Sequence, residues 1–187
     1  VTGVTISRNQ HSYAESRLDG RADIQLRDYR DIDGTYDNIV SIEMIEAVGV
    51  RYWPSYFSVL KRNLSEGGRI LLQAITVKDS FFETYKTSSD YIRQYVFPGG
   101  MLISPARFSQ EAKRAGLSFL SSIEFGESYS LTLRRWHEVF TQRWDQIQAL
   151  GYDARFKRLW DFYLTSCAAA FRTGICDVTQ ITLRREG

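Results

Sequence analysis

Cysteine and histidine are scarce in this sequence of 187 residues. The spacing of Cys167 and Cys176 matches neither a disulfide framework nor a CxxC metal or redox motif, so we expect both thiols to be reduced. His11 and His137 lie far apart and lack the HExxH spacing of a histidine metal site. We therefore predict no metal site.

An excess of one charge and long apolar runs are also missing. The 24 basic and 22 acidic residues leave a formal net charge of +2, so we expect no nucleic-acid partner. No segment reaches the ~18 apolar residues of a membrane helix, and the first ten residues, VTGVTISRNQ, lack the pattern of a secretory signal. These absences predict a cytoplasmic protein.

The length and composition of the chain suit one domain spanning residues 1–187. Hydrophobic residues make up 43% of the chain and charged residues 25%, which are ordinary values for a chain that buries a core. Aromatic residues make up 14%, and many of them lie in the second half. Core packing and an aromatic-walled pocket for an apolar substrate both explain them at this stage.

Predicted strands and helices alternate along the chain. The predicted strands cover residues 1–6, 23–28, 39–42, 69–76, 117–125 and 177–183. The predicted helices cover residues 7–18, 52–64, 81–96, 104–116, 129–150 and 153–171, with turns at 65–68 and 97–100. This order indicates an α/β fold with a doubly wound, mostly parallel sheet. A helical insert or lid is expected at about 81–100, and a helical segment at about 129–171.

Polar residues follow three of the predicted strands. Ser7 and Asp28 end the first two strands, and the stretch SIEMIEAVG places Glu43 and Glu46 after the third. Ligands of doubly wound sheets bind at the carboxyl ends of the strands. We therefore expect the functional site at this edge of the sheet.

Seven stretches occur in a fixed order. They are VTGVTIS with RNQ at 1–10, DYR at 28–30, SIEMIEAVG at 41–49, two glycines and then LLQAI at 67–75, FPGG at 97–100, CAAAFRTG at 167–174 and DVTQ at 177–180. In this order they resemble the cyclopropane-fatty-acyl-phospholipid synthases and the related mycolic acid cyclopropane synthases, over essentially the whole chain. The resemblance implies a class I, Rossmann-like methyltransferase domain that uses S-adenosylmethionine. Such an enzyme converts a cis double bond of an unsaturated phospholipid acyl chain into a cyclopropane ring, with bicarbonate as the base.

The resemblance also concerns the start of the chain. The first central strand, its glycine-rich loop and the cysteine of the bicarbonate site have no counterpart before Val1. We therefore expect a C-terminal fragment whose sheet has a gap between residues 1–6 and 38–42. Rearrangement of these strands, a second chain in an oligomer, or exposed apolar edges are the three expected outcomes. A fragment that is inactive and serves only as a binding or assembly module is the alternative from another class.

Eight residues match the family's cofactor-binding segments, namely Thr5, Ile6, Ser7, Gln10, Asp28, Tyr29, Ile42 and Glu43. The resemblance assigns the first four to the ribose, although Ser7 and Gln10 also form a helix-capping pair. It assigns Asp28 to the exocyclic amine of adenine and Tyr29 to the ring, although aspartate at a strand end also forms turns. Ile42 and Glu43 would lie beside the cofactor, and mycolate-type members have glycine in place of Glu43.

Four residues match the family's catalytic bicarbonate site, namely Glu46, Tyr129, Gln73 and Ile75. Glu46 would accept the O–H of bicarbonate, and Tyr129 would donate to one of its oxygens. The backbone of Ile75 would help to hold the anion, and Gln73 stands where many bacterial members have histidine. The competing interpretations are an acid favoured by a helix dipole for Glu46 and ordinary packing for Tyr129.

An enzyme of this kind collects acyl chains from a bilayer, so the resemblance implies peripheral contact with the inner face of the membrane. The aromatic segment 81–97 and the patch of Arg134, Arg135 and Arg143 are hypothetical contacts. Candidates for stabilising a carbocation are Tyr91, Tyr95, Phe97, Trp136 and Phe140. Methylation of a lipid or a small molecule without ring closure is the rival activity.

Overall fold

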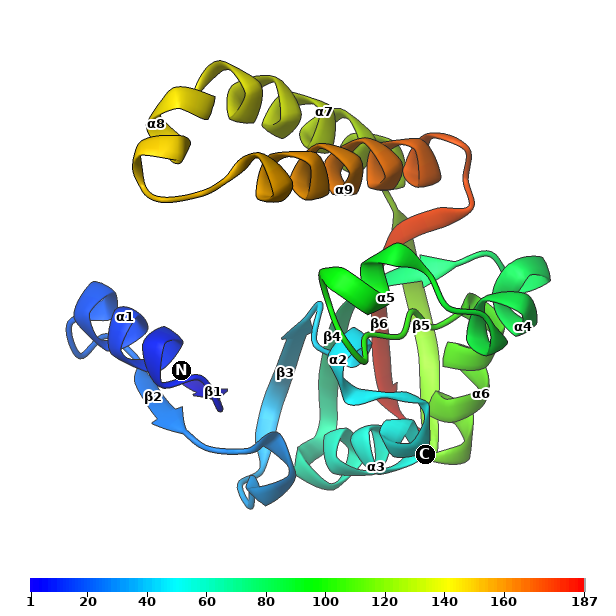
Figure 1. Cartoon of the computed structure of the whole chain (residues 1–187). Coiled ribbons are helices and arrows are strands. Elements are labelled where there is room, and N and C mark those ends of the chain that lie inside the picture. The colour runs from blue at the N-terminus through cyan, green and yellow to red at the C-terminus, as the bar shows by residue number, and fades with distance from the viewer. Residues whose placement is uncertain (187) are drawn as a thin grey trace.

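The computed structural model describes residues 1–186, in which strands and helices alternate (Figure 1). The strands are β1 (Thr2–Thr5), β2 (Asp23–Leu26), β3 (Tyr36–Ile42), β4 (Leu64–Val77), β5 (Leu117–Glu124) and β6 (Cys176–Arg185). The α-helices are α1 (Arg8–Leu18), α2 (Ile45–Val48), α3 (Trp53–Asn63), α4 (Asp79–Thr87), α5 (Tyr91–Tyr95), α6 (Pro105–Arg114), α7 (Gly126–Gln142), α8 (Trp144–Ala149) and α9 (Ala154–Arg172). Short 3-10 helices cover Tyr29–Asp31 and Val50–Tyr52.

The larger sheet has the strand order β3-β4-β6-β5. β3 and β4 pair in parallel, whereas β6 pairs antiparallel with both β4 and β5. Three of the four strands therefore share one direction, and β6 is reversed. The carboxyl ends of β3 and β4 meet at one edge of this sheet, which is where such folds bind ligands.

β1 and β2 form a separate parallel pair. Within residues 1–186, no ladder hydrogen bonds join this pair to β3, so the sheet is interrupted at the place predicted from the sequence. Figure 1 shows β1, β2 and α1 as a group to the left of β3. Val40 and Ile42 of β3 are 61% and 58% exposed, so this edge of the sheet is apolar in the single chain.

β4 is longer than predicted, because residues 65–68 continue the strand instead of forming a turn. Gly67 has a φ of +75°, which glycine adopts without strain. The pairing with β3 shifts its register between Tyr36 and Asn38, so the strand passes through an irregularity and then continues. A stretch of serine, glutamate and two glycines is typical of turns, and its sequence does not reveal that Leu64 and Arg69 on either side of it both pair with β3.

The predicted helix over residues 81–96 is divided into α4 and α5. Asp90 caps α5, because its Oδ1 accepts from the Arg93 N–H at 3.0 Å. The Arg93 guanidinium also donates to the carbonyl oxygens of Tyr85 and Ser88, at 2.9 Å and 2.6 Å, and so holds the two helices together. The expected insert is therefore helical but not one continuous helix.

The predicted helix over residues 129–150 is also divided, into α7 and α8, at Arg143. α7 begins at Gly126, earlier than predicted, because the Gly126 N–H donates to Asp177 Oδ1 at 2.7 Å. This contact with β6 holds the first turn of α7 at the sheet. The turn is held by a contact between residues far apart in the sequence, so no local pattern indicated it.

The main core lies between the larger sheet and the helices α2, α3 and α6. Phe57 of α3 meets Phe108 of α6 edge-on, with 5.1 Å between the ring centroids. Burial of each large apolar side chain contributes about 1.5–3 kcal/mol to stability. The largest fully buried side chains include Trp53, Tyr56, Phe57, Phe108, Leu64, Ile70, Leu72 and Ile103.

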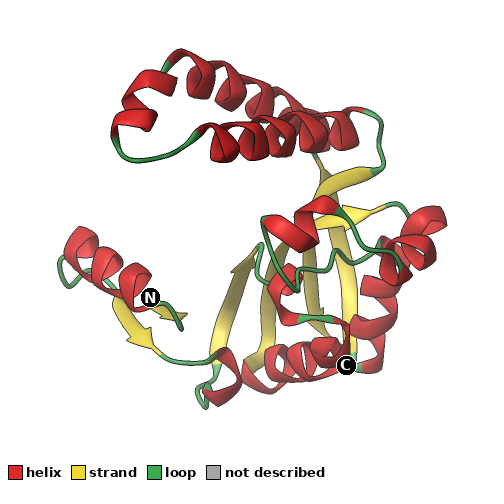
Figure 2. Cartoon of the chain, in the orientation of Figure 1, coloured by secondary structure: helices red, strands yellow, loops and turns green. Residues whose placement is uncertain are grey.

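α7 and α9 pack against each other as a helical hairpin above the sheet in the view of Figure 2. A second buried cluster lies between these two helices and β6, with Leu133, Phe140, Leu164, Phe171 and Val178. Several aromatic side chains of α5, of the turn after it and of α7 and α9 stay exposed, namely Tyr95, Phe97, Trp136 and Phe162. The abundant aromatic residues therefore serve the core and also leave an aromatic surface. In residues 1–186, no helix is both long and apolar enough to cross a bilayer.

Candidate functional site

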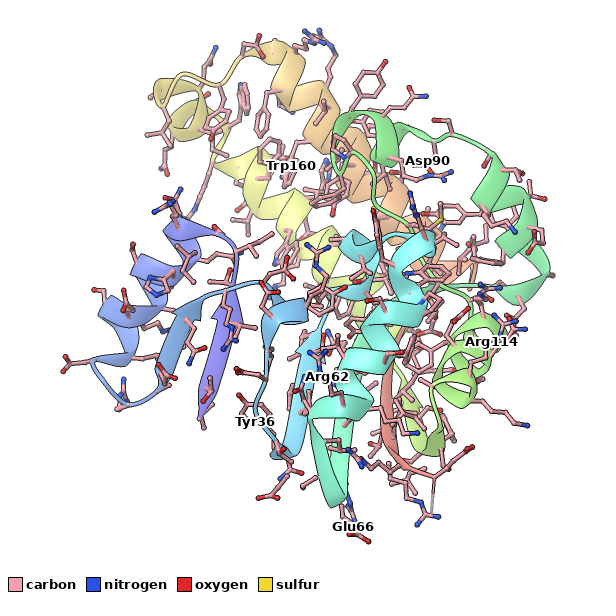
Figure 3. The ribbon with its side chains drawn as sticks, turned by 90° about the horizontal axis from the view of Figure 1, so that it is seen from below. Tyr36, Arg62, Glu66, Asp90, Arg114 and Trp160 are labelled. Carbon is pink, nitrogen blue, oxygen red and sulfur yellow. The ribbon has the colours of Figure 1, made fainter. Side chains whose placement is uncertain are left out.

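The candidate site lies where β3 ends beside β4, close to the start of α7. Tyr36 and Glu66 mark the opposite end of these two strands. Figure 3 shows Tyr36 and Glu66 at one end of the molecule and Trp160 of α9 at the other. The helical hairpin is therefore on the same side as the carboxyl ends of β3 and β4.

Glu43 directly follows β3 and has a φ of +50°, a left-handed conformation that costs a non-glycine residue roughly 1–2 kcal/mol. Its backbone N–H donates to the Gln73 carbonyl oxygen at 2.8 Å. Its Oε1 accepts from the Tyr129 hydroxyl at 2.5 Å and from Gln73 Nε2 at 2.8 Å. The Glu43 carboxylate is thus held by two donors, one from α7 and one from β4.

Glu46 lies in the first turn of α2, and its Oε1 accepts from the Ile75 N–H at 2.6 Å. Its Oε2 is buried and has no hydrogen-bond partner among the described residues. Burial raises the pKa of the Glu46 carboxyl, and its hydrogen bonds to backbone N–H groups offset part of this rise. A buried acceptor without a donor costs about 1–3 kcal/mol, so a ligand that donates an O–H here would remove this cost.

Tyr129 lies near the start of α7, and its ring packs between Phe125 and Phe171, with centroid distances of 5.7 Å and 5.6 Å. Burial, together with the hydrogen bond and negative charge of Glu43, raises the pKa of the Tyr129 hydroxyl to about 12. The hydroxyl is therefore protonated at neutral pH and acts as a donor. In this structure its acceptor is Glu43 and not Glu46.

Gln73 lies at the centre of these contacts. Its Nε2 donates to Glu43 and also to the Tyr129 hydroxyl, at 3.0 Å. Its Oε1 accepts from Gln180 Nε2 of β6 at 2.9 Å. Gln73 therefore connects three elements of the fold through one side-chain amide.

The structure groups the four residues assigned to the bicarbonate site into two hydrogen-bonded pairs connected through β4, namely Gln73 with Tyr129 and Ile75 with Glu46. It adds Glu43, which the resemblance placed beside the cofactor, and Gln180, which sequence reasoning missed. The alternation in DVTQITL places Gln180 on one face of its strand. That signal does not identify the strand opposite, because pairing between distant segments is decided by the tertiary fold.

The residues assigned to the ribose form a local capping arrangement at the start of α1. Ser7 Oγ accepts from the Gln10 N–H at 3.3 Å, and Gln10 Oε1 accepts from Thr5 Oγ1 at 2.8 Å. Thr5 Oγ1 also accepts from the Ser7 N–H at 3.1 Å. Ile6 is 76% exposed. The capping interpretation of Ser7 and Gln10 thus describes their contacts here, and the assignment to the ribose stays a prediction.

Asp28 begins the 3-10 helix that contains Tyr29, and Arg30 binds it. Its Oδ1 accepts from Arg30 N and Nε, both at 2.9 Å, and its Oδ2 accepts from Arg30 Nη2 at 2.7 Å. The Arg30 side-chain hydrogen bond lowers the pKa of the Asp28 carboxyl. The Tyr29 ring lies edge-on to Tyr56, whose hydroxyl donates to Ser41 Oγ of β3 at 2.8 Å. Tyr29 is therefore connected to β3, one residue before Ile42.

The two groups of predicted residues are not in hydrogen-bond contact in the described part of the chain. The side-chain hydrogen bonds of Glu43, Glu46 and Tyr129 join residues in or next to β3, α2, β4 and α7, and those of Thr5 and Gln10 stay within residues 5–10. In residues 1–186, no cluster of three or more His, Cys, Asp or Glu side chains could hold a metal ion. The site as folded is an arrangement of carboxylate, phenol and amide groups.

Solved structures define the class of this fold. The chain matches the mycolic acid cyclopropane synthase CmaA1, solved with SAH and CTAB, with a TM-score of 0.88 and 26% identity, over 99% of this chain and 70% of that one. It matches the cyclopropane synthase MmaA2 from Mycobacterium tuberculosis with a TM-score of 0.87 and 24% identity, over 98% of this chain and 69% of that one. The fold is that of S-adenosylmethionine-dependent methyltransferases, and the predicted fold class is confirmed.

The chain belongs to the family described as mycolic acid cyclopropane synthetase, which matches residues 1–181, so the predicted family is confirmed. It is 41% identical to the tuberculostearic acid methyltransferase UfaA1 of Mycobacterium tuberculosis, over all of this chain and 45% of that protein. It is 37% identical to the cyclopropane-fatty-acyl-phospholipid synthase of Escherichia coli K12, over 99% of this chain and 47% of that protein. The chain thus spans about half the length of these curated relatives.

Proposed function

We propose that this chain belongs to an S-adenosylmethionine-dependent enzyme that converts the cis double bond of an unsaturated phospholipid acyl chain into a cyclopropane ring. Its family, its 37% identity to a cyclopropane-fatty-acyl-phospholipid synthase and its cluster of carboxylate, phenol and amide groups support this activity. S-adenosylmethionine would supply an electrophilic methyl group, and bicarbonate would supply the base. The proposed cofactor contacts are those assigned from the sequence, namely Thr5, Ile6, Ser7, Gln10, Asp28, Tyr29, Ile42 and Glu43.

The observation that carries the anion site is the capture of the Glu43 carboxylate by two donors. Carboxylate and bicarbonate share a planar O–C–O group, so donors that hold one can hold the other. The Tyr129 O–H and the Gln73 N–H are such donors, at 2.5 Å and 2.8 Å from Glu43 Oε1. With Glu43 turned aside, they would face an oxygen of bicarbonate. Glu46 Oε2, which has no donor among the described residues, would then accept the O–H of the anion.

The proposed reaction moves one carbon and releases one proton. The π electrons of the double bond would form a new carbon–carbon bond to the methyl group while the bond from that methyl group to sulfur breaks. The electron pair of the broken bond would stay on sulfur, so that S-adenosylhomocysteine leaves, and the other alkene carbon would carry the positive charge. One C–H bond of the added methyl group then breaks, its electron pair closes the three-membered ring, and the proton passes to the base. The protein groups Tyr129, Gln73 and Glu46 would contribute by holding that base in a fixed orientation.

Aromatic side chains near Glu43 suit the positive charge of this reaction. Tyr163 packs against the same buried cluster of α7 and α9 as Tyr129, whose hydroxyl donates to Glu43. Phe97 lies edge-on to Tyr163, with 5.9 Å between the ring centroids. An aromatic face stabilises a nearby cation by about 0.5–2 kcal/mol without forming a bond to it.

The proposal includes where the enzyme works. Its lipid substrate implies peripheral contact with the inner face of the cytoplasmic membrane, and the exposed rings of Tyr95 and Phe97 are suitable contacts. A homo-oligomer that covers the exposed edge of β3 is a further part of the proposal, because Val40 and Ile42 leave that edge apolar.

The test is product formation from S-adenosylmethionine and vesicles of a phospholipid with one cis double bond. Proton NMR of the extracted lipid distinguishes cyclopropane protons from alkene protons. Glu46→Gln removes the charged acceptor but keeps its size, and we expect it to lower ring formation by about 10²-fold through misplacement of the base. Glu66→Gln, at the other end of β4, is the matched control (Figure 3). Equal rates for wild type and Glu46→Gln would reject the role of Glu46.

Methyl transfer without ring closure is the second candidate, because the chain is 41% identical to a relative named as a tuberculostearic acid methyltransferase. Here the cation would lose a proton from the chain carbon that bears the new methyl group, and the electron pair of that C–H bond would form a carbon–carbon double bond within the chain. A cyclopropane and this methyl-branched alkene have the same mass, so mass spectrometry alone does not separate them. NMR does, since only the second product has an alkene proton.

A further inference from the structure

Gln73 and Gln180 face each other directly across the antiparallel pair of β4 and β6. Gln180 Nε2 donates to Gln73 Oε1 at 2.9 Å. Both side chains are half-buried, so water competes only partly for this contact. The hydrogen bonds of Gln180 in the described residues lead to Gln73 and not to Glu43 or Tyr129. Any influence of Gln180 on the cluster therefore passes through Gln73.

The amide of Gln73 has one acceptor oxygen and one nitrogen with two hydrogens. The oxygen accepts from Gln180, and the nitrogen donates to Glu43 Oε1 at 2.8 Å and to the Tyr129 hydroxyl at 3.0 Å. An amide rotated by half a turn would place its oxygen against the Glu43 carboxylate, so two acceptors would meet. It would also place its N–H groups against the donor of Gln180. Every contact of this amide thus depends on one orientation.

We propose that Gln180 is a positioning residue, which holds the Gln73 amide with its N–H groups toward the anion site. This inference rests on the proposed function, and it deepens that function by identifying what orients the amide. The donor of Gln180 occupies the Gln73 oxygen, and the Gln73 nitrogen is then directed to the anion. In this arrangement the donor of Gln180 and the acceptor of Glu43 favour the same orientation of the Gln73 amide, in which Gln73 offers a donor to the ligand.

Two substitutions separate the polarity of Gln180 from its size. Gln180→Glu keeps the shape but can only accept, so Gln73 would have to turn its N–H groups toward the new carboxylate oxygens and its own oxygen toward Glu43. Gln180→Met keeps the length and removes the donor without imposing the reverse orientation. We expect turnover to fall by about 10–100-fold in Gln180→Glu and by less in Gln180→Met, as is usual when the partner of a ligand-binding group is lost. Gln148→Glu on α8, an exposed residue, makes the same chemical change away from the site.

A second readout does not depend on turnover. The side-chain amide of Gln73, labelled with ¹⁵N and assigned by its absence in Gln73→Glu, reports its hydrogen bonds by its NMR shifts. We expect this signal to move in Gln180→Glu and to stay in place in Gln148→Glu. An active wild type whose turnover and Gln73 signal are both unchanged in Gln180→Glu overturns the inference and leaves the proposed function standing. An inactive wild type overturns the proposed function, and the positioning role falls with it.

Discussion

The Tyr129 hydroxyl donates to Glu43 Oε1 at 2.5 Å, and it is Glu43, not Glu46, that holds it. The two carboxylates have different surroundings, although they are close in sequence. Glu43 lies just before α2, and Glu46 lies in its first turn. Glu43 binds two side-chain donors near the surface, whereas Glu46 is more deeply buried and binds the Ile75 N–H. The Glu43 carboxylate therefore occupies the donors of Tyr129 and Gln73. Oε2 of Glu46, in contrast, has no donor among the described residues.

The contact between Glu43 and Tyr129 predicts how the phenol titrates. The pKa of Tyr129 is raised to about 12 by burial and by Glu43, because a nearby negative charge disfavours the phenolate. We expect Glu43→Gln to lower this pKa, since the charge is removed while the side chain keeps its length. Ultraviolet difference titration against Tyr129→Phe isolates this phenol. Glu127→Gln, an exposed acid of the same helix, should leave the titration unchanged; an unshifted Tyr129 in Glu43→Gln would contradict the contact.

Burial of Glu46 predicts a dependence of stability on pH. The pKa of Glu46 is raised in the folded chain above its ordinary value of 4.5, so the folded state binds this proton more tightly than the unfolded state. Its contribution to the free energy of unfolding is then largest below pH 4.5 and is lost as the pH rises through the folded pKa.

In Glu46→Gln, the free energy of unfolding should not fall in this way as the pH rises, because glutamine does not ionise. Its oxygen can still accept from the Ile75 N–H. Urea unfolding of both proteins across this pH range gives the difference in free energy between them. We expect the variant to gain stability relative to wild type as the pH rises. Glu66→Gln is the exposed control, and a difference between wild type and Glu46→Gln that is flat with pH would rule out the raised pKa.

Gly126 packs closely against Asp177 at the start of α7, and this contact predicts the effect of adding one methyl group to Gly126. A Cβ on Gly126 would lie 2.8 Å from Asp177 Oδ1 and 3.1 Å from Asp177 Cα, so the helix start would have to move. We expect Gly126→Ala to lower the free energy of unfolding by about 1–3 kcal/mol. It should also change the Tyr129 titration, since Tyr129 lies within one turn of Gly126. Ser128→Ala, at an exposed position of the same turn, is the control; full stability of Gly126→Ala would show that the helix start tolerates the displacement.

Much of the fold could be predicted from local patterns. The Ser7 and Ser104 caps and the alternation in residues 177–183 indicated the elements that the structure contains. The boundaries that differed depend on distant partners. β4 continues through residues 65–68 because Leu64 and Arg69 on either side of them pair with Tyr36 and Asn38 of β3, and α7 starts early because Asp177 of β6 binds Gly126.

The candidate site divides in the same way. The pattern of SIEMIEAVG placed Glu43 and Glu46 at the end of a strand, and the family resemblance added Gln73, Ile75 and Tyr129. Neither revealed that Glu43 would hold the Tyr129 hydroxyl. That contact joins residues 86 positions apart, and only the packing of α7 against the sheet brings them together.

The sequence by itself determined the α/β alternation, the family and the polar residues at the strand ends, because periodicity, capping and motif order are local properties of the chain. The tertiary structure decided which carboxylate binds Tyr129, which glutamine faces Gln73 and where the sheet is interrupted. These outcomes depend on strand register and helix packing between distant segments, where a single hydrogen-bond donor has several acceptors within reach and the folded geometry selects one.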